Sequence, residues 1–194
     1  MATLGFVSNA YFWAQTGYFD DLAITKPLLH MWSLAVEEQF YLFFPPLLWW
    51  LHSWRRVPVW AVLSCLFAAS LALSIYQLAD AESAAFYLPF GRAWEFVAGA
   101  WLVFSPWRGR DWLGWRRLVG WVSLPVLLAT IVFYSSHTPF PAQGALAPVL
   151  ATVGLIWAGE RGAGPCRILS WRPLVAVGLI SYSLYLWHWP VIVL

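Results

Sequence analysis

The sequence predicts an all-α fold, a polytopic membrane helix bundle that forms a single domain over residues 1–194. Three observations predict this fold. Hydrophobic residues make up 61% of the chain and charged residues 10%, whereas soluble domains are about 25% charged. The chain contains 16 tryptophans, a residue that membrane proteins concentrate at the two bilayer surfaces. Long apolar stretches alternate with short polar segments, and most charges fall in those segments.

The apolar stretches predict about six transmembrane helices, preceded by a shorter apolar segment at residues 3–13. That segment has about 11 residues, which is too few to cross a bilayer, so we expect it to be the end of a truncated N-terminal helix. Pro58 suits the first turn of the second helix. We expect the chain to end inside the last helix or at its end. The predicted helices are residues 33–51, 58–78, 84–104, 118–134, 143–158 and 174–194.

The first of these helices contains polar features that a simple membrane anchor lacks. Its 19 residues would extend over about 28 Å, enough to cross the hydrocarbon core. Glu37 and Glu38 lie near its start, and a carboxylate inside a bilayer costs roughly 2.5–3.5 kcal/mol. Pro45 and Pro46 remove two backbone donors and are expected to bend or unwind the helix where it lines a cavity. We therefore expect this helix to take part in the function of the protein.

The distribution of basic residues predicts the orientation of the bundle. The segments 52–57, 105–117 and 159–173 hold nine of the 11 basic residues, and the alternate segments hold Lys26 alone. Basic residues accumulate in cytoplasmic loops of membrane proteins. The arginine-rich segments are therefore predicted to be cytoplasmic, and both ends of the chain to lie on the external side.

Four ionisable residues remain inside predicted helices: Glu37, Glu38, Arg92 and Glu95. Arg92 and Glu95, three residues apart on one helix, are spaced to form a neutralising ion pair. Glu37 and Glu38 would still lack a partner, which indicates a polar cavity or raised carboxyl pKa values. Because both helices enter from the external side, all four residues are expected at a similar depth in the outer part of the membrane. Ionisable residues inside a membrane are functional candidates.

Two histidines and several arginines are further candidates. His30, just before the first full helix, and His188, near the external end of the last one, are either acid–base groups or ordinary interfacial residues. Arg55, Arg56, Arg108 and Arg110 could bind the phosphates of a cofactor, although the orientation rule alone also explains them. Cys65 and Cys166 have no spacing typical of a metal site, so no metal is expected.

Three segments resemble the membrane-bound acyltransferase 3 family, which includes O-antigen and other polysaccharide acetylases. They are PLLHMWSLAVEEQF at residues 27–40, PFGRAWEFVAGAWL at residues 89–102 and VGLISYSLYLWHWP at residues 177–190. The segments follow the order and spacing of the family across essentially the whole chain. Met31 replaces a threonine that is common in the first segment, and Val177 a leucine in the third.

The resemblance implies a multi-pass protein of the bacterial inner membrane that transfers an acyl group, usually acetyl. The donor would be cytoplasmic acetyl-CoA, used as a substrate with no bound cofactor, and the acceptor a cell-surface carbohydrate hydroxyl; no nucleic acid is implied. Arg92 would stabilise developing charge, while Glu37, Glu38 and Glu95 would orient the acceptor or a general base. Family members also have earlier helices that carry an arginine and a histidine, and some have an external hydrolase-like domain. We expect the chain without those helices to be inactive on its own.

Two alternatives remain open at this stage. A transporter or flippase would use the same intramembrane charges to bind a substrate or relay protons. A purely structural subunit would tolerate replacement of all four charges. Consumption of a thioester separates the enzyme from the transporter, because a transporter has no reason to cleave acyl-CoA. The acyl group, the acceptor sugar and the oligomeric state do not follow from the sequence.

Overall fold

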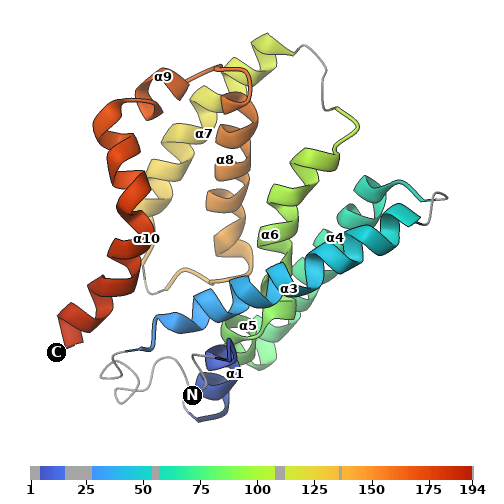
Figure 1. Ribbon diagram of the computed structural model, residues 1–194, viewed down its shortest axis with the longest axis vertical. Helices are drawn as coiled ribbons and strands as arrows, with labels where there is room; N and C mark the ends of the chain where they lie inside the picture. The colour runs from blue at the N-terminus through green and yellow to red at the C-terminus, as the bar shows by residue number, and fades with distance from the viewer. Residues whose placement is uncertain (1–4, 16–27, 54–56, 108–111, 136, 194) are drawn as a thin grey trace.

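The computed structural model describes residues 5–15, 28–53, 57–107, 112–135 and 137–193, and all regular secondary structure in these ranges is helical. The predicted all-α class is confirmed (Figure 1). In chain order the helices are α1 (Ser8–Gln15), α3 (Met31–Ser53), α4 (Val59–Asp80), α5 (Glu82–Tyr87), α6 (Pro89–Phe104), α7 (Leu113–Phe133), α8 (Gln143–Gly159), α9 (Cys166–Leu169) and α10 (Arg172–Val193).

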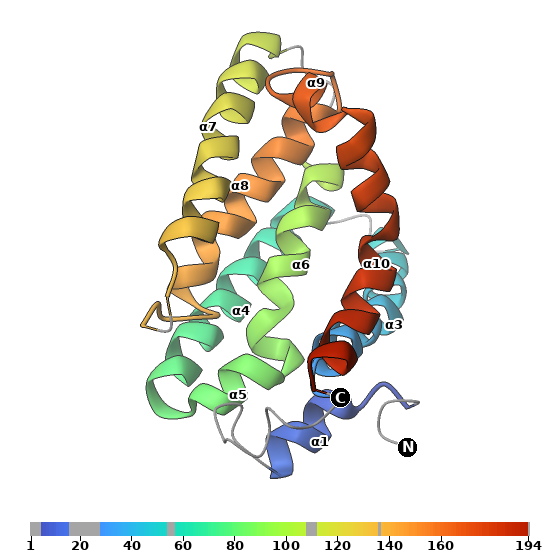
Figure 2. The ribbon, with the colours of Figure 1, turned by 90° about the vertical axis from the view of Figure 1, so that its left-hand side faces the viewer.

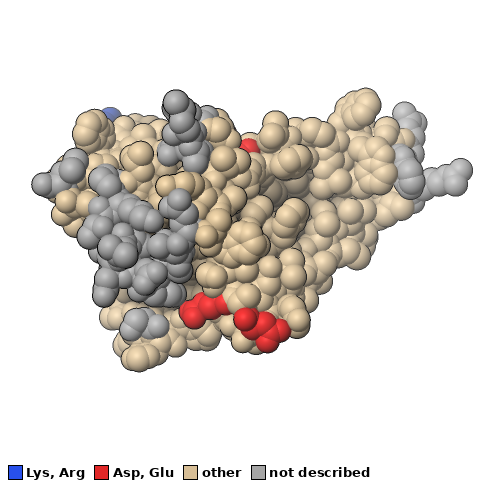
Figure 3. Space-filling model, turned by 90° about the horizontal axis from the view of Figure 1, so that it is seen from below, with Lys and Arg blue, Asp and Glu red and all other residues tan. Residues whose placement is uncertain are grey.

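Two helix pairs form the centre of the bundle. α4 packs along α6, α7 packs along α8, and α6 also contacts α8, which joins the two pairs (Figures 1 and 2). The end of α6, the start of α7 and the connection from α8 through α9 to α10 lie at the upper end in Figure 1, and these segments carry Arg116, Arg117, Arg161, Arg167 and Arg172. The start of α3, the turn between α4 and α5, and the end of α10 lie at the lower end. Seen from below, the part of the surface that is not grey carries acidic side chains and almost no basic ones (Figure 3).

Small residues and one serine hydroxyl hold the helix pairs close together. On α4, Ser70 Oγ donates to the Phe90 carbonyl at 2.6 Å and accepts from the Trp94 N–H at 3.0 Å, so it lies within the backbone hydrogen-bond ladder of α6. Trp94 is fully buried against this contact. Between α7 and α8, neighbouring atoms leave no room for a side chain at Gly120 or at Gly154. Such close packing is the usual source of helix association in a bilayer, where lipid tails are as apolar as the side chains.

α4, α7 and α10 are long and apolar enough to cross a membrane, and α8 is a shorter apolar helix. These helices support the assignment as an integral membrane protein. α3 has 23 residues, but its two glutamates, its glutamine and its prolines reduce its mean hydropathy. It remains one uninterrupted α-helix from Met31 to Ser53, so the expected unwinding at Pro45 and Pro46 is wrong; both prolines are exposed on its surface.

Two further predicted boundaries are also corrected. The helix expected over residues 84–104 is divided at Leu88, which has an extended backbone before Pro89. Proline has no N–H and disfavours helical geometry in the preceding residue, so α6 begins anew at Pro89. The helix expected from residue 118 begins at Leu113, because Arg116 is buried in the bundle and extends α7 toward its N-terminus.

Candidate active site

A cavity of about 380 Å³ opens between the start of α3, the start of α6 and the end of α10, on the lower side of the bundle in Figure 1. Five elements contribute to it, because α5 and the connection between α7 and α8 each supply an aromatic ring. Its lining combines polar and aromatic residues with one leucine: Leu29, His30, Trp32, Ser33, Phe86, Arg92, Phe140, Tyr185, His188 and Trp189. Its volume falls in the range of small-molecule sites.

Arg92 is the cationic residue of this cavity and lies in the first turn of α6. Its Nη2 is 2.7 Å from Glu95 Oε2, and its Nε donates to Glu95 Oε1 at 3.1 Å, which confirms the predicted ion pair. The two side chains are 15% and 14% exposed. The guanidinium carbon lies 5.1 Å from the centre of the Trp32 ring, within the range of a cation–π contact. Glu95 and the aromatic ring therefore fix the arginine in place.

His30 precedes α3 in a turn and faces the same cavity. The residue is only 8% exposed, and neither ring nitrogen forms a hydrogen bond of normal geometry with a described residue. Burial lowers the pKa of His30, the nearby imidazole of His188 lowers it further, and the backbone of Leu186 opposes this shift only in part. His30 is therefore neutral at neutral pH, with a free nitrogen lone pair that can accept a proton.

α10 contributes a second histidine whose tautomer is defined by its surroundings. The His188 ring centre lies 5.4 Å from that of His30, and His188 Nδ1 is 2.6 Å from the Tyr185 carbonyl oxygen. Since a carbonyl only accepts, Nδ1 carries the hydrogen and a neutral His188 presents Nε2 as the proton acceptor. The Tyr185 hydroxyl donates to the His30 carbonyl at 2.5 Å and contacts the Ser33 hydroxyl, which connects α10 to the start of α3.

The predicted catalytic residues are only partly brought together. His30 and Arg92 line the cavity, and Glu95 lies behind Arg92. Glu37 instead accepts a hydrogen bond from Tyr41 at 2.8 Å on α3, and neither it nor Glu38 lines any of the described cavities. The expected meeting of all four charges at one point is therefore not observed. All four predicted phosphate-binding residues lie outside the described residues: Arg55, Arg56, Arg108 and Arg110.

Sequence reasoning missed Tyr185, Ser33 and Phe140. The spacing of residues could have indicated Tyr185, because His188 and Trp189 follow it by three and four residues and so lie on the same helix face. Nothing in the sequence indicated that this face would meet the start of α3, which lies 152 residues away at Ser33.

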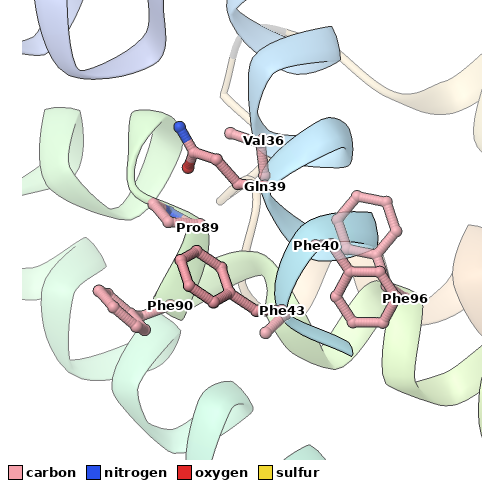
Figure 4. Close-up of a pocket in the computed structure, with 8 residues that line it drawn as sticks. Val36, Gln39, Phe40, Phe43, Pro89, Phe90 and Phe96 are labelled. Atoms are coloured by element: carbon pink, nitrogen blue, oxygen red, sulfur yellow. The ribbon is translucent and has the colours of Figure 1, made fainter. Parts of the chain in front are cut away.

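Two neighbouring cavities differ in chemistry. A groove of about 240 Å³ between α3 and α6 is lined by Phe40, Phe43, Phe90 and Phe96 and has no titratable group (Figure 4). Its one polar side chain, Gln39, directs its amide away from the rings (Figure 4) and donates to the Phe6 carbonyl of the segment before α1 at 2.7 Å. The groove therefore offers an apolar surface without reactive groups.

The other cavity, of about 470 Å³, lies between α6 and α8 and is lined by residues that include Glu95, Gly99, Phe140, Thr152 and Val153. It shares Phe140 with the histidine-containing cavity, so the two adjoin at the Arg92–Glu95 pair. This second cavity therefore extends the site toward the upper end of the bundle.

The sequence profile of the acyltransferase domain family, acyltransferase 3, matches residues 1–194. The chain belongs to the acyltransferase 3 family. The peptidoglycan O-acetyltransferase OatA of Listeria monocytogenes is 29% identical to the present chain. The match covers all of the present chain and 33% of OatA. BcsY of Komagataeibacter xylinus, provisionally named a membrane-bound transacylase, is 34% identical, with 98% of the present chain and 48% of BcsY matched.

The O-acetyltransferase OatA of Staphylococcus aureus is a further acyltransferase 3 relative, at 29% identity over 100% of the present chain and 34% of OatA. The chain thus spans between a third and a half of the length of these curated relatives. No solved structure matches it. Within this acyltransferase 3 chain, the three segments quoted from the sequence supply His30, Arg92 and His188, three of the polar residues that the cavity brings together.

Proposed function

We propose that this chain forms the membrane part of an O-acyltransferase that moves an acyl group, in the first instance acetyl, from cytoplasmic acyl-CoA to a carbohydrate hydroxyl at the outer face. The observation that carries this proposal is the buried, neutral His30 that lines the same cavity as the fixed cation Arg92. Acyl transfer to a hydroxyl needs these two functions, a proton acceptor and a stabiliser of negative charge.

The proposed reaction uses the cavity residues as follows. The acceptor hydroxyl oxygen attacks the thioester carbonyl carbon while His30, or His188 through Nε2, takes the hydroxyl proton. The resulting oxyanion is stabilised by the charge of Arg92, which Glu95 and Trp32 hold in position. The carbon–sulfur bond then breaks, the ester forms, and CoA leaves as a thiolate that takes up a proton.

The aromatic lining supports a carbohydrate acceptor. Trp32, Phe86, Phe140 and Trp189 surround the polar groups of the cavity, and the flat apolar faces of sugar rings pack on such side chains. One relative is named as a peptidoglycan O-acetyltransferase, which supports a cell-wall or other surface polysaccharide. Glu37 and Glu38 stay in the proposal as groups that orient the acceptor.

The side of the membrane follows from the charges. The histidine-containing cavity lies at the start of α3 and the end of α10, opposite the start of α7 and the connection from α8 to α10, whose arginines the positive-inside rule assigns to the cytoplasm. In a bacterium with two membranes this orientation fits the inner membrane, where acyl-CoA is available on one side and polysaccharide precursors on the other.

The test is a transfer assay in membranes that express the protein from its complete gene, with radiolabelled acetyl-CoA and isolated polysaccharide. The unsubstituted protein should release CoA and label the polysaccharide. The double variant with His30 and His188 both changed to Gln should reduce transfer by about 10²–10⁴-fold for loss of the general base, and the single variant with the same loss identifies which histidine is the base. His52→Gln, an exposed histidine at the other end of α3, is the matched control.

Two outcomes would contradict the proposal. Full activity in the His30, His188 double variant would remove both histidines from the chemistry. Movement of a sugar across the membrane without release of CoA would instead support a transporter.

A further inference from the structure

Five tryptophans converge on one cavity at the end of the bundle that carries the basic connections. The cavity has a volume of about 340 Å³ and lies between the ends of α6 and α8 and the start of α7. Its aromatic lining is Trp101, Trp107, Trp112, Trp115 and Trp157. Trp107 and Trp112 are stacked, with ring centres 6.2 Å apart and an angle of 27° between the planes.

An interfacial belt does not account for this arrangement. The rings of an interfacial belt sit at the level of the lipid headgroups, whereas these rings come from the ends of α6, α7 and α8 and line one cavity. Trp101 is held in place by a hydrogen bond from its Nε1 to Ser64 Oγ at 3.0 Å. Trp157 is held by Arg116, whose guanidinium carbon lies 4.6 Å from the ring centre. Arg116 is itself 1% exposed and donates to the Trp157 carbonyl and to Glu160.

The chemistry of this end of the bundle selects an occupant with a flat ring and negative charge. Tryptophan faces bind nucleobases by stacking, independently of base identity. Exposed arginines on α7, on the connection between α8 and α9, on α9 and at the start of α10 lie at the same end of the bundle and would attract phosphates. They are Arg117, Arg161, Arg167 and Arg172.

We infer that this tryptophan cavity binds the adenine ring of the acyl-CoA donor on the cytoplasmic side. The inference rests on the proposed function and adds the donor's nucleotide site to it. The cavity also shares Val153 with the cavity between α6 and α8, which in turn shares Phe140 with the histidine-containing cavity. Adjoining cavities therefore follow α8 from Trp157 to Ala145, about 18 Å at 1.5 Å per residue. A donor with its adenine among the tryptophans would extend its thioester arm along this route toward Glu95 and Arg92.

The decisive experiment compares two donors that differ only in the nucleotide. Acetyl-CoA and acetyl-pantetheine carry the same thioester arm, and the second lacks adenine and the phosphates attached to its ribose. Trp107→Ala and Trp112→Ala should each raise KM for acetyl-CoA by about 5- to 140-fold, the range expected for one stacking contact. KM for acetyl-pantetheine and kcat with either donor should stay unchanged. Phe at either position should restore most of the affinity, and Trp171→Ala, exposed at the same end but outside the cavity, is the control.

A binding measurement separates failure of this inference from failure of the proposed function. A photoreactive azido-adenine analogue of CoA should label the segment from Trp101 to Trp115, and excess CoA should prevent the labelling. Absence of such labelling, or an equal rise in KM for both donors, would overturn the adenine site even if acetyl transfer is confirmed. Competition of the labelling by phospholipid but not by CoA would identify the cavity as a lipid site. Competed labelling without any acetyl transfer would support the site while contradicting the proposed reaction.

Discussion

The Arg92–Glu95 ion pair allows the structural and the chemical roles of the site to be separated. Each charge is mostly buried, at 15% and 14% exposure, and is compensated by the other. Arg92→Met removes the partner of Glu95 and leaves a carboxylate beside an apolar neighbourhood. Removing one member of a buried pair costs about 3–5 kcal/mol, and the residual exposure here places the expected loss near 3 kcal/mol. For a domain of this size that corresponds to a fall of about 6–12 °C in the melting temperature.

The double variant, with Arg92 and Glu95 both changed to Met, should behave differently. Replacement of both charges by apolar side chains of similar volume is commonly neutral or stabilising. We therefore expect its melting temperature in detergent to return to within about 2 °C of the unsubstituted protein, at roughly 2–4 °C per kcal/mol. Acetyl transfer should nevertheless be lost, because no cation remains to stabilise the oxyanion. Arg117→Met, an exposed arginine on α7, is the stability control.

Three results would refute this reasoning. Arg92→Met with unchanged stability would mean that the pair is solvated by water or lipid headgroups. A double variant no more stable than Arg92→Met would mean that the cost arises from lost packing on Trp32 and not from an unpaired charge. A stable double variant with full transfer would show that the pair serves the fold alone.

Three further predictions use other parts of the structure. A cysteine in place of Glu82 should react with an impermeant thiol reagent added outside sealed cells, whereas one in place of Ser170 should not; the opposite pattern would invert the orientation. Gly120→Ala should lower stability by about 1–3 kcal/mol, because the new Cβ would lie 2.9 Å from Ala158 Cβ and Pro165 Cδ, which cannot rotate away. Gly114→Ala is the control: its Cβ would meet nothing within 4 Å, so it should be neutral or stabilising in the same melting assay. Because folding lowers the pKa of His30, the folded protein binds fewer protons than the unfolded chain between the folded-state pKa and 6.5. The contribution of His30 to stability and the transfer rate should therefore both decline as the pH falls through the folded-state pKa, and a pH profile unchanged by His30→Gln would contradict this.

Local sequence spacing predicted the features that depend on one helix. Arg92 and Glu95 are three residues apart, and helix geometry alone brings their side chains together. The helix positions also followed from the length of apolar runs. The division at Leu88 was predictable from Pro89, whose effect on the preceding residue is local, but the apolar composition of the surrounding stretch concealed it.

The features that depend on two helices did not follow from the sequence. Depth in the membrane placed Glu37 and Glu38 near Arg92, yet depth does not specify which way a helix is rotated about its axis. Packing of α3 directs Trp32, Ala35 and Val36 into the bundle, and this rotation leaves Glu37 to pair with Tyr41. The charge of Arg116 predicts a loop position, but the structure places it in α7. The Trp157 carbonyl and Glu160 accept hydrogen bonds from its guanidinium inside the bundle.

The position of the polar groups in the fold explains how a membrane protein can maintain them. His30 lies just before α3, Arg92 lies in the first turn of α6, and His188 lies near the C-terminal end of α10. Helix ends face the membrane surface, so the cost of a polar side chain is lower there than at the bilayer centre. A polar acceptor can therefore approach the histidines without crossing the hydrocarbon core. In the proposed reaction only the acyl group and its thioester arm travel through the membrane, along the surfaces of α6 and α8, where small residues such as Gly99 and Ala145 leave space.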